Sequence, residues 1–351
     1  MPAEEARFYE KLEGGLVRCT ICPRRCVIKP GERGFCGTRE NRDGKLYSLI
    51  YGEVSASAVD PIEKKPLFHF EPGSLTFSIS SVGCSFRCPW CQNYHISMAK
   101  PEEYRTVRMG PEEVVRLAKQ YGCPSISITY NEPLIWLEYV EDVGKLAKRE
   151  GLEVVLVTNG YITLEALDAV AGLIDAANVD VKSFSDDFYR RYCKGDLESV
   201  LQAVVAMKEK GIHVETTTLL IPGLNDSEEE LKALCKWHYE YLGPDTPIHF
   251  SRFFPCYKML FKPPTPTSTL QKAYDIAVET GLRYVYVGNL PGNPCEHTYC
   301  PGCGRPVIKR MGFEIVEWRL DEHMRCTDCG AKIPIRGKLH RRGSWSPFMI
   351  Y

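Results

Sequence analysis

The sequence lacks the features of exported, membrane-spanning and strongly charged proteins. The amino terminus is charged from Glu4 onward and has no apolar run of the signal-peptide kind. Nowhere do 18 apolar residues follow one another, so no membrane span is expected. Lys and Arg number 44 against 45 Asp and Glu, so nothing in the net charge of -1 favours binding to an anionic surface. We expect a cytoplasmic protein with no membrane partner, and do not expect a nucleic-acid partner unless a local basic patch provides one.

Cysteine is the residue that the sequence has in excess. The 351 residues include 16 cysteines. This cysteine content is too low for a disulfide-stabilised scaffold and higher than expected for a globular protein of this size without metal or redox sites. In a reducing cytosol, clustered thiols are more often metal or redox ligands than disulfides. Most of them form three groups, namely Cys19, Cys22, Cys26 and Cys36; Cys84, Cys88 and Cys91; and Cys300, Cys303, Cys326 and Cys329.

Strand-like and helix-like segments alternate between the second and third groups. Strands are expected at residues 76–82, 125–129, 153–158, 177–181, 213–221, 248–253 and 283–287. A helix with one apolar face is expected after Pro111, and another is expected to be capped by Asn225 or Asp226. The pattern predicts an α/β fold with a parallel sheet, either a full or partial barrel or an open doubly wound sheet.

The central group has the spacing C-x3-C-x2-C and directly follows the first expected strand. A closed structural site needs four protein ligands, whereas three thiolates around a 4Fe–4S cluster leave one iron free to bind something else. The alternatives are a zinc site completed by His95, or merely buried thiols. The strand position and Trp90, just before the last cysteine, resemble a known cluster-binding motif, and this resemblance favours the cluster.

These residues resemble a known family. The triplet resembles the cluster motif of radical S-adenosylmethionine (SAM) enzymes, and residues 91–93 are similar to the Cys-His-Asn continuation in glycyl-radical-enzyme activases, except for Gln92. Residues 60–70, 129–133 and 286–289 together resemble the AmmeMemoRadiSam system radical SAM enzyme family, which is related to pyruvate formate-lyase activating enzymes.

The resemblance implies a partial (β/α)6 radical SAM barrel at residues 75–290. A four-cysteine module with a lead-in segment precedes it at 1–74, and a zinc-ribbon-like module follows at 291–351. It also implies a 4Fe–4S cluster on the central triplet, with SAM bound to the open iron. Reductive cleavage of SAM to a 5′-deoxyadenosyl radical would then abstract hydrogen from an unidentified small-molecule or macromolecular substrate.

The resemblance also assigns residues to SAM, although two positions depart from the family pattern. The assigned residues are Trp90, Asn93, Tyr130, Asn131, Glu132, Thr158, Asn159, Asp180 and Lys182. Tyr130 and Asn131 stand where many relatives have two glycines, and Val157 stands where activases often have an acidic residue beside a monovalent cation. The plainer alternatives are a helix-entry turn at Asn131 and a Lys182 side chain that simply reaches water.

Four polar residues on the later strands are candidates for catalysis. Glu215 shares one strand face with His213, and a buried carboxylate needs a partner. Arg252 can clamp a carboxylate or phosphate, and Cys256 or Tyr257 can relay hydrogen or contact substrate. The alternative for each is ordinary packing or an ion pair.

The segment at residues 60–70 combines charged and aromatic residues. Glu63, Lys64 and Lys65 are followed by an apolar stretch that contains His69. This pattern is compatible with a segment folded over the barrel mouth with His69 or a lysine near substrate. It is equally compatible with a solvated charge run followed by a packing anchor, and the sequence alone leaves both open.

The two outer cysteine groups both predict metal sites, but the C-terminal spacing indicates one metal more specifically than the N-terminal spacing does. The C-terminal group consists of two C-x2-C pairs, each followed by glycine, which predicts a structural zinc ribbon. The N-terminal spacing, C-x2-C-x3-C-x9-C, favours zinc over a second iron–sulfur cluster because it is not ferredoxin-like. The other cysteines, among them Cys123, Cys193 and Cys295, carry no individual signal.

The function expected first is that of a radical SAM enzyme. The nonacidic Val157 favours modification of a small molecule or macromolecule over a glycyl-radical-enzyme activase. A low-potential electron donor such as ferredoxin or flavodoxin is expected, as are the AMMECR-type and Memo-type partners that the family name suggests. A different class, a non-catalytic zinc-rich scaffold that binds nucleic acid, would rely on basic stretches such as residues 338–342.

Overall fold

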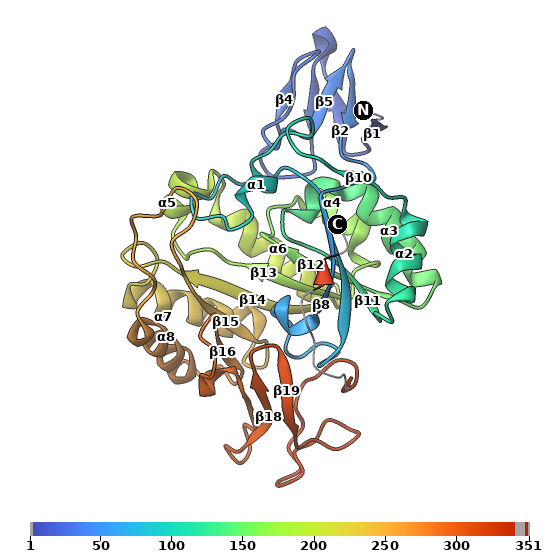
Figure 1. Cartoon of the computed structure of the whole chain (residues 1–351). Coiled ribbons are helices and arrows are strands. Elements are labelled where there is room, and N and C mark those ends of the chain that lie inside the picture. Colours follow the sequence, from blue (N-terminus) through green and yellow to red (C-terminus); the bar gives the residue numbers. More distant parts are fainter. Residues whose placement is uncertain (1–2, 341–347, 350–351) are drawn as a thin grey trace.

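A nine-stranded, mostly parallel sheet forms the centre of the chain (Figure 1). The computed structural model describes residues 3–340 and 348–349. Seven neighbouring strands are parallel: β9 (Leu75–Ser80), β11 (Ser125–Ile128), β12 (Glu153–Thr158), β13 (Ala176–Asp180), β14 (His213–Leu220), β15 (Ile248–Arg252) and β16 (Val285–Gly288). Antiparallel β8 (Ala56–Pro61) and β20 (Phe348–Met349) extend the sheet beyond β9. All seven expected strands are confirmed, with ends shifted by at most two residues.

The strand order distinguishes between the two architectures that the sequence left open. Each parallel strand lies beside the next one in the chain, and the order never reverses as it does in a doubly wound sheet. This is the order of a β/α barrel, left open because β16 and β20 stand at opposite edges. Six strand–helix units agree with the expected (β/α)6 count, and β16 adds a seventh parallel strand after the last helix.

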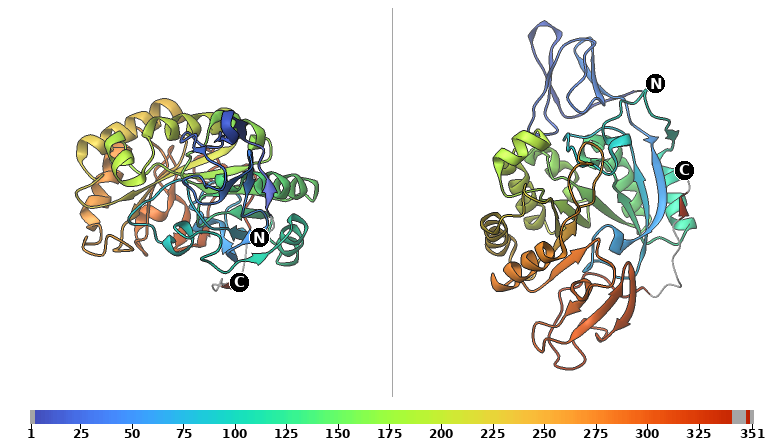
Figure 2. Two further views of the ribbon diagram at one scale, coloured as in Figure 1. Left: turned by 90° about the horizontal axis from the view of Figure 1, so that it is seen from above. Right: turned by 60° about the vertical axis from the view of Figure 1, so that its left-hand side comes forward.

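A long helix lies in each connection between successive parallel strands, on the outer face of the sheet (Figure 2). These helices are α2 (Pro111–Gln120), α3 (Leu137–Arg149), α4 (Leu164–Ala171), α6 (Leu197–Glu209), α7 (Glu228–Trp237) and α8 (Thr267–Glu279). The expected cap of α7 is wrong, because Ser227 accepts the bond from the Glu230 N–H. Asn225 instead bonds the Ile221 N–H in the loop after β14. No helix in the described part of the chain is long and apolar enough to cross a membrane.

Two small β modules lie at opposite ends of this sheet (Figures 1 and 2). The N-terminal strands are β1 (Glu4–Glu5), β2 (Tyr9–Lys11), β3 (Val17–Cys19), β4 (Val27–Ile28), β5 (Arg39–Arg42) and β6 (Lys45–Ser48). The C-terminal strands are β17 (Thr298–Tyr299), β18 (Pro306–Met311) and β19 (Glu314–Trp318). Short elements elsewhere are β7 (Glu53–Val54), β10 (Val107–Arg108), α1 (Tyr94–Ser97) and α5 (Asp186–Phe188).

The N-terminal module shares its apolar core with the barrel. Val17 and Leu46 belong to the same buried cluster as the sheet residues Phe77 and Ile126. A buried ion pair also joins the two parts. The guanidinium of Arg39 on β5 lies 2.6 Å from the carboxylate of Glu138 on α3, and both side chains are almost completely buried.

The segment at residues 62–71 is held between the inner face of the sheet and the C-terminal module. The Glu215 carboxylate on β14 accepts hydrogen bonds from the backbone N–H groups of Phe68 (3.0 Å) and His69 (2.7 Å). On the other side, the Arg310 guanidinium of β18 donates to the Phe68 carbonyl oxygen at 3.0 Å. The His69 ring lies 2.6 Å from the Tyr286 hydroxyl. These contacts fix the segment as part of the interior.

Replacing Glu215 is expected to weaken the fold and to change its pH dependence. Burial acts to raise the pKa of Glu215, but hydrogen bonds from His213 and His249 hold it well below its usual value. The carboxylate therefore stabilises the fold above its unfolded pKa of about 4.3, and this contribution is lost as the pH falls below that value. Glu215→Gln should lower the free energy of unfolding at pH 7 by about 3–5 kcal/mol and flatten its decline in acid.

Anaerobic urea unfolding at pH 7 and pH 3 measures both effects. Glu209→Gln, at the exposed end of α6, is the matched control and should behave like the wild type. An unchanged pH dependence in Glu215→Gln would show that this carboxylate does not organise the interior.

Breaking the buried ion pair between the N-terminal module and α3 is expected to destabilise the protein. Arg39→Met leaves the Glu138 carboxylate buried and without its cation, so the free energy of unfolding should fall by about 3–5 kcal/mol. The double variant Arg39→Met/Glu138→Leu removes the stranded charge and should recover most of this loss. A single variant as stable as the wild type in urea unfolding would contradict this account.

Candidate functional site

A cavity of about 580 Å³ opens at the carboxyl ends of the parallel strands. This volume is within the range of small-molecule sites, about 300–1,000 Å³. The loop after β9, the ends of β11 to β16, part of the segment 62–71 and Phe313 between β18 and β19 contribute to its lining. The sheet, the segment 62–71 and the C-terminal module therefore all contribute to its wall.

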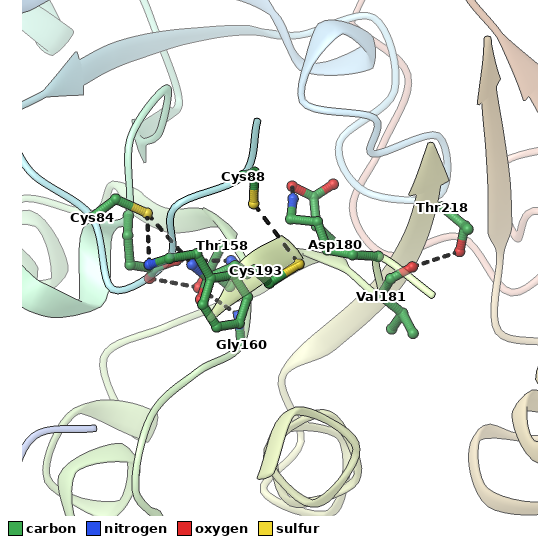
Figure 3. Close-up of polar contacts among 12 residues, drawn as sticks. Cys84, Cys88, Thr158, Gly160, Asp180, Val181, Cys193 and Thr218 are labelled. Atoms are coloured by element: carbon green, nitrogen blue, oxygen red, sulfur yellow. Dashed lines mark hydrogen bonds and ion pairs between the residues drawn. The ribbon is translucent and has the colours of Figure 1, made fainter. Parts of the chain in front are cut away.

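The three central cysteines lie together on this cavity. Cys84, Cys88 and Cys91 all line it. The Phe86 N–H points at the Cys84 Sγ at 3.4 Å, and the Asn159 side-chain amide lies 3.7 Å from the same sulfur (Figure 3). Such N–H donors stabilise thiolate charge and tune the iron–sulfur clusters that thiolates bind. The arrangement therefore fits a cluster held by three thiolates.

The expected alternative of a zinc site completed by His95 does not fit. His95 is exposed and packs beside Tyr94 and Tyr104, away from the cavity lining. Within the described residues, the triplet also does not form a group of ligand atoms lying within 4.8 Å of one another. The three thiols therefore remain an open, three-ligand set.

A fourth cysteine near the triplet was not expected from the sequence. The Sγ of Cys193 lies 4.0 Å from the Sγ of Cys88, and its carbonyl oxygen accepts a 3.0 Å bond from the Arg87 N–H (Figure 3). Cys193 is fully buried at the end of a π-helical turn, Tyr189–Cys193. Cys193 is so far from the triplet in the sequence that no cysteine spacing indicates that they lie together.

All the residues that the resemblance assigned to SAM line the same cavity. They are Trp90, Asn93, Tyr130, Asn131, Glu132, Thr158, Asn159, Asp180 and Lys182. They come from four loops at the carboxyl ends of β9, β11, β12 and β13, which the parallel sheet brings to one edge. The cavity therefore places the triplet and this polar set in one continuous space.

Glu132 connects two of these loops. Its carboxylate accepts hydrogen bonds from the Thr158 hydroxyl (2.7 Å) and the Asn159 N–H (2.8 Å), as well as from the Leu134 N–H. Burial raises the pKa of Glu132 to about 7, although these bonds act in the opposite direction. Because Glu132 fixes Asn159, it also fixes the amide that faces Cys84.

Tyr130 has a backbone conformation that glycine adopts without strain, which agrees with the glycine that the resemblance implies at this position. Its φ of 68° lies in the left-handed region, where glycine is strain-free. The Asn93 side-chain amide donates to its carbonyl oxygen at 2.8 Å, which ties β11 to the cysteine loop. The Tyr130 hydroxyl donates to Asp60, so β8 is connected to the same point.

Asp180 and Lys182 form an ion pair on the cavity wall. The Lys182 Nζ lies 2.6 Å from an Asp180 carboxylate oxygen. The lysine side chain is only 15% exposed, so the alternative in which it simply reaches water is wrong. The pair places one cation and one anion beside the triplet.

The four residues expected to be catalytic do not belong to the cavity lining. Glu215 is fully buried and holds the segment 62–71. The Arg252 Nε donates to the Thr265 carbonyl oxygen at 2.9 Å, and this bond joins the two ends of the loop that follows β15. Cys256 lies 3.7 Å from the Cys91 carbonyl oxygen, and Tyr257 stacks on Tyr94, so both brace the cysteine loop from outside.

Neighbouring residues on the same strands face the cavity instead. Thr217 follows Glu215 by two positions on β14, and His249 and Ser251 come from β15. The Thr217 hydroxyl is buried and has no hydrogen-bond partner among the described residues. Because side chains alternate along a strand, Thr217 could have been predicted to share the strand face of Glu215. Nothing in the sequence indicates that His249 and Ser251, rather than their neighbours, face the cavity.

The segment 62–71 combines parts of both interpretations of its sequence. Lys64 and Lys65 line the cavity, and the Lys65 Nζ lies 2.5 Å from the Asp60 carboxylate. His69, however, is fully buried and acts as an anchor. The segment therefore lines the cavity with its lysines and packs against the C-terminal module through His69.

The two outer cysteine groups differ in geometry. The sulfur atoms of Cys300, Cys303, Cys326 and Cys329 all lie within 4.8 Å of one another. Tetrahedral zinc with Zn–S bonds of about 2.3 Å holds its sulfurs about 3.8 Å apart, so this group fits one metal ion. Within the described residues, the N-terminal group does not reach this spacing.

Comparison with known proteins adds family evidence to this geometry. Residues 78–235 match the Radical SAM superfamily. An uncharacterized protein of Methanocaldococcus jannaschii is 48% identical over 332 residues, which cover 94% of this chain and 99% of that protein.

Two further relatives carry functional names. A GTP 3′,8-cyclase of Lactiplantibacillus plantarum is 26% identical over 261 residues, covering 66% of this chain and 74% of the cyclase. A second Methanocaldococcus jannaschii protein, named a "putative glycyl-radical enzyme activating enzyme", is 26% identical over 198 residues, covering 54% of this chain and 75% of that protein. With the sheet order and the cysteine-lined cavity, the family match shows that residues 78–235 belong to the radical SAM superfamily.

Proposed function

We propose that the chain is an enzyme that holds a 4Fe–4S cluster on Cys84, Cys88 and Cys91 and cleaves SAM reductively. The observation that carries the proposal is the cavity in which three thiols and the polar residues of four strand ends face one another. The bound cluster and SAM would supply the chemistry, namely one-electron cleavage of the sulfonium bond to a 5′-deoxyadenosyl radical that abstracts hydrogen from substrate.

The residues of the chain would hold and orient these groups. The Lys182 ammonium would attract the SAM carboxylate, and Asp180 would keep that ammonium in place. Glu132 would keep the Asn159 amide directed at the Cys84 sulfur. The buried walls around them would exclude water from the reacting atoms.

The substrate would occupy the end of the cavity that faces the C-terminal module. There the wall is formed by Phe68, Thr217, His249 and Phe313, and the Thr217 hydroxyl offers a hydrogen bond that no described residue uses. These residues come from three separate parts of the chain, including the segment whose sequence resembles the AmmeMemoRadiSam family. We therefore propose a small-molecule or macromolecular substrate at this end of the cavity. Reductive cleavage of SAM would need a low-potential donor of the ferredoxin or flavodoxin type. The resemblance to the AmmeMemoRadiSam family is our reason for proposing AMMECR-type and Memo-type partners.

A glycyl-radical-enzyme activase is the second candidate function. The similarity to the named activating enzyme of Methanocaldococcus jannaschii favours it. Val157 lines the cavity where activases often have an acidic residue, which argues against it. Hydrogen abstraction from a glycine of a partner protein, detected as a glycyl radical signal, would favour the activase.

A nucleic-acid scaffold is the least supported candidate. Of the basic stretch 338–342, residues 341 and 342 lie outside the described residues, and His340 pairs with Glu71. The cavity with its three thiols has no role in such a scaffold.

Replacing Cys84 is expected to abolish SAM cleavage. Cys84→Ala removes one of three thiolates, so the central cluster should be lost and reduced protein should form neither methionine nor 5′-deoxyadenosine from SAM. Anaerobic reconstitution followed by quantification of both products measures this. Cys123→Ser, a buried cysteine outside all three groups, is the matched control and should retain product formation. Product formation by Cys84→Ala, or none by a wild type with an intact cluster, would contradict the proposal.

We also propose that the C-terminal group binds a structural zinc ion. Cys300→Ser should lose about one zinc per chain without losing iron, because four thiolates close a tetrahedral site. Elemental analysis of purified protein measures both metals, with Cys295→Ser as the neighbouring control. Zinc content unchanged in Cys300→Ser would rule out this site.

A further inference from the structure

The N-terminal cysteine group, Cys19, Cys22, Cys26 and Cys36, lies against the loop of the central triplet. A Cβ added to Gly83, the residue before Cys84, would come within 2.8 Å of the Cys36 carbonyl oxygen. The segments that carry the two groups are therefore in direct backbone contact, and Gly83, with a φ of 84°, permits the close approach.

Side chains from both segments reinforce this contact. Phe35, next to Cys36, is stacked under the guanidinium of Arg24 at 3.6 Å and under that of Arg87 at 4.4 Å. Arg24 donates to the Ser85 carbonyl oxygen at 3.2 Å, and Arg87 donates to the Phe35 carbonyl oxygen. Each segment thus donates hydrogen bonds to the backbone of the other. The N-terminal cysteine group is therefore packed against the triplet loop and is not merely connected to the barrel by the chain.

The spacing of sulfur atoms separates the three cysteine groups into two kinds. The C-terminal group is as compact as a single zinc ion requires. Within the described residues, neither the N-terminal group nor the central triplet has three sulfurs within 4.8 Å of one another. A cubane spreads its thiolates over several irons, so wider spacing suits a cluster better than one metal ion. In this respect the N-terminal group resembles the triplet.

The N-terminal group is also accessible from outside. Cys22, Cys26 and Cys36 are half-buried, and Val27, beside Cys26, is 54% exposed. In the triplet Cys88 is buried, whereas Cys84 and Cys91 are half-buried and face the cavity rather than the outer surface. A protein donor can therefore approach the N-terminal group while the far side of that group touches the cysteine loop of the cavity.

We infer that the N-terminal group holds a second iron–sulfur cluster that passes electrons to the central triplet. The relay rests on the proposed function, whereas the presence of the second cluster does not. One electron enters at the N-terminal group from a low-potential one-electron donor, and one electron leaves it for the triplet. No bond or proton changes in this step.

Metal analysis of single-cysteine variants tests the second cluster without measuring catalysis. Wild-type protein should contain about eight iron and eight sulfide, and Cys26→Ser and Cys84→Ala should each lose about four of both, as expected for two 4Fe–4S clusters. Cys123→Ser is the matched control. Reduced Cys84→Ala should still give the paramagnetic signal of the N-terminal cluster. This signal detects the second cluster directly, so the test does not depend on whether Cys26→Ser folds. Cys84→Ala protein with no iron and about two zinc per chain would overturn the inference, because four-thiolate zinc would then fill both outer groups.

The relay has its own test. Reduction of the central cluster by reduced flavodoxin should slow severalfold in Cys26→Ser compared with Cys123→Ser, with the central cluster intact in both. An unchanged rate would overturn the relay and leave the second cluster standing. Failure of SAM cleavage in wild type with about eight iron would instead count against the proposed function.

Discussion

A buried carboxylate, that of Glu215, holds the inside of the molecule together. A charge without water needs several partners, and Glu215 finds them in two histidine rings and in the backbone of Phe68 and His69. Through those two residues the sheet is joined to the segment 62–71, and through Arg310 to the C-terminal module. The end of the cavity that would receive the substrate exists because this interaction draws three distant parts of the chain together.

Much of the fold could be predicted from the sequence, for reasons that particular elements make clear. The parallel strands are short apolar runs bounded by turns, and the first turn of α2 carries Pro111, so their positions follow from local pattern. The residues assigned to SAM could be placed because each belongs to a motif at a strand end. Tyr130 has the left-handed backbone that glycine adopts without strain, at a position where the family resemblance implies glycine.

The rest depended on contacts between distant residues. The sequence indicates that Glu215 needs a partner and places His213 on the same strand face. No spacing, however, indicates His249 or the backbone of the segment 62–71, which supply the other contacts. Arg252, Cys256 and Tyr257 are polar residues near strand ends, yet their loop folds back on Thr265 and Tyr94 instead of into the cavity. The spacing of cysteines along the chain likewise differs from the spacing of their sulfur atoms, which separates the compact C-terminal group from the two wider ones.

Phe313 gives the C-terminal module a role beyond its own stability. The residue lies between β18 and β19, and its ring forms part of the cavity wall, while the proposed zinc ion sits elsewhere in the same small module. A metal held by four thiolates contributes to the folding of a module this small. Under the proposed function, loss of the proposed zinc would leave the barrel and its cysteine triplet in place but open the cavity wall at Phe313, so that a radical formed there would meet solvent before substrate.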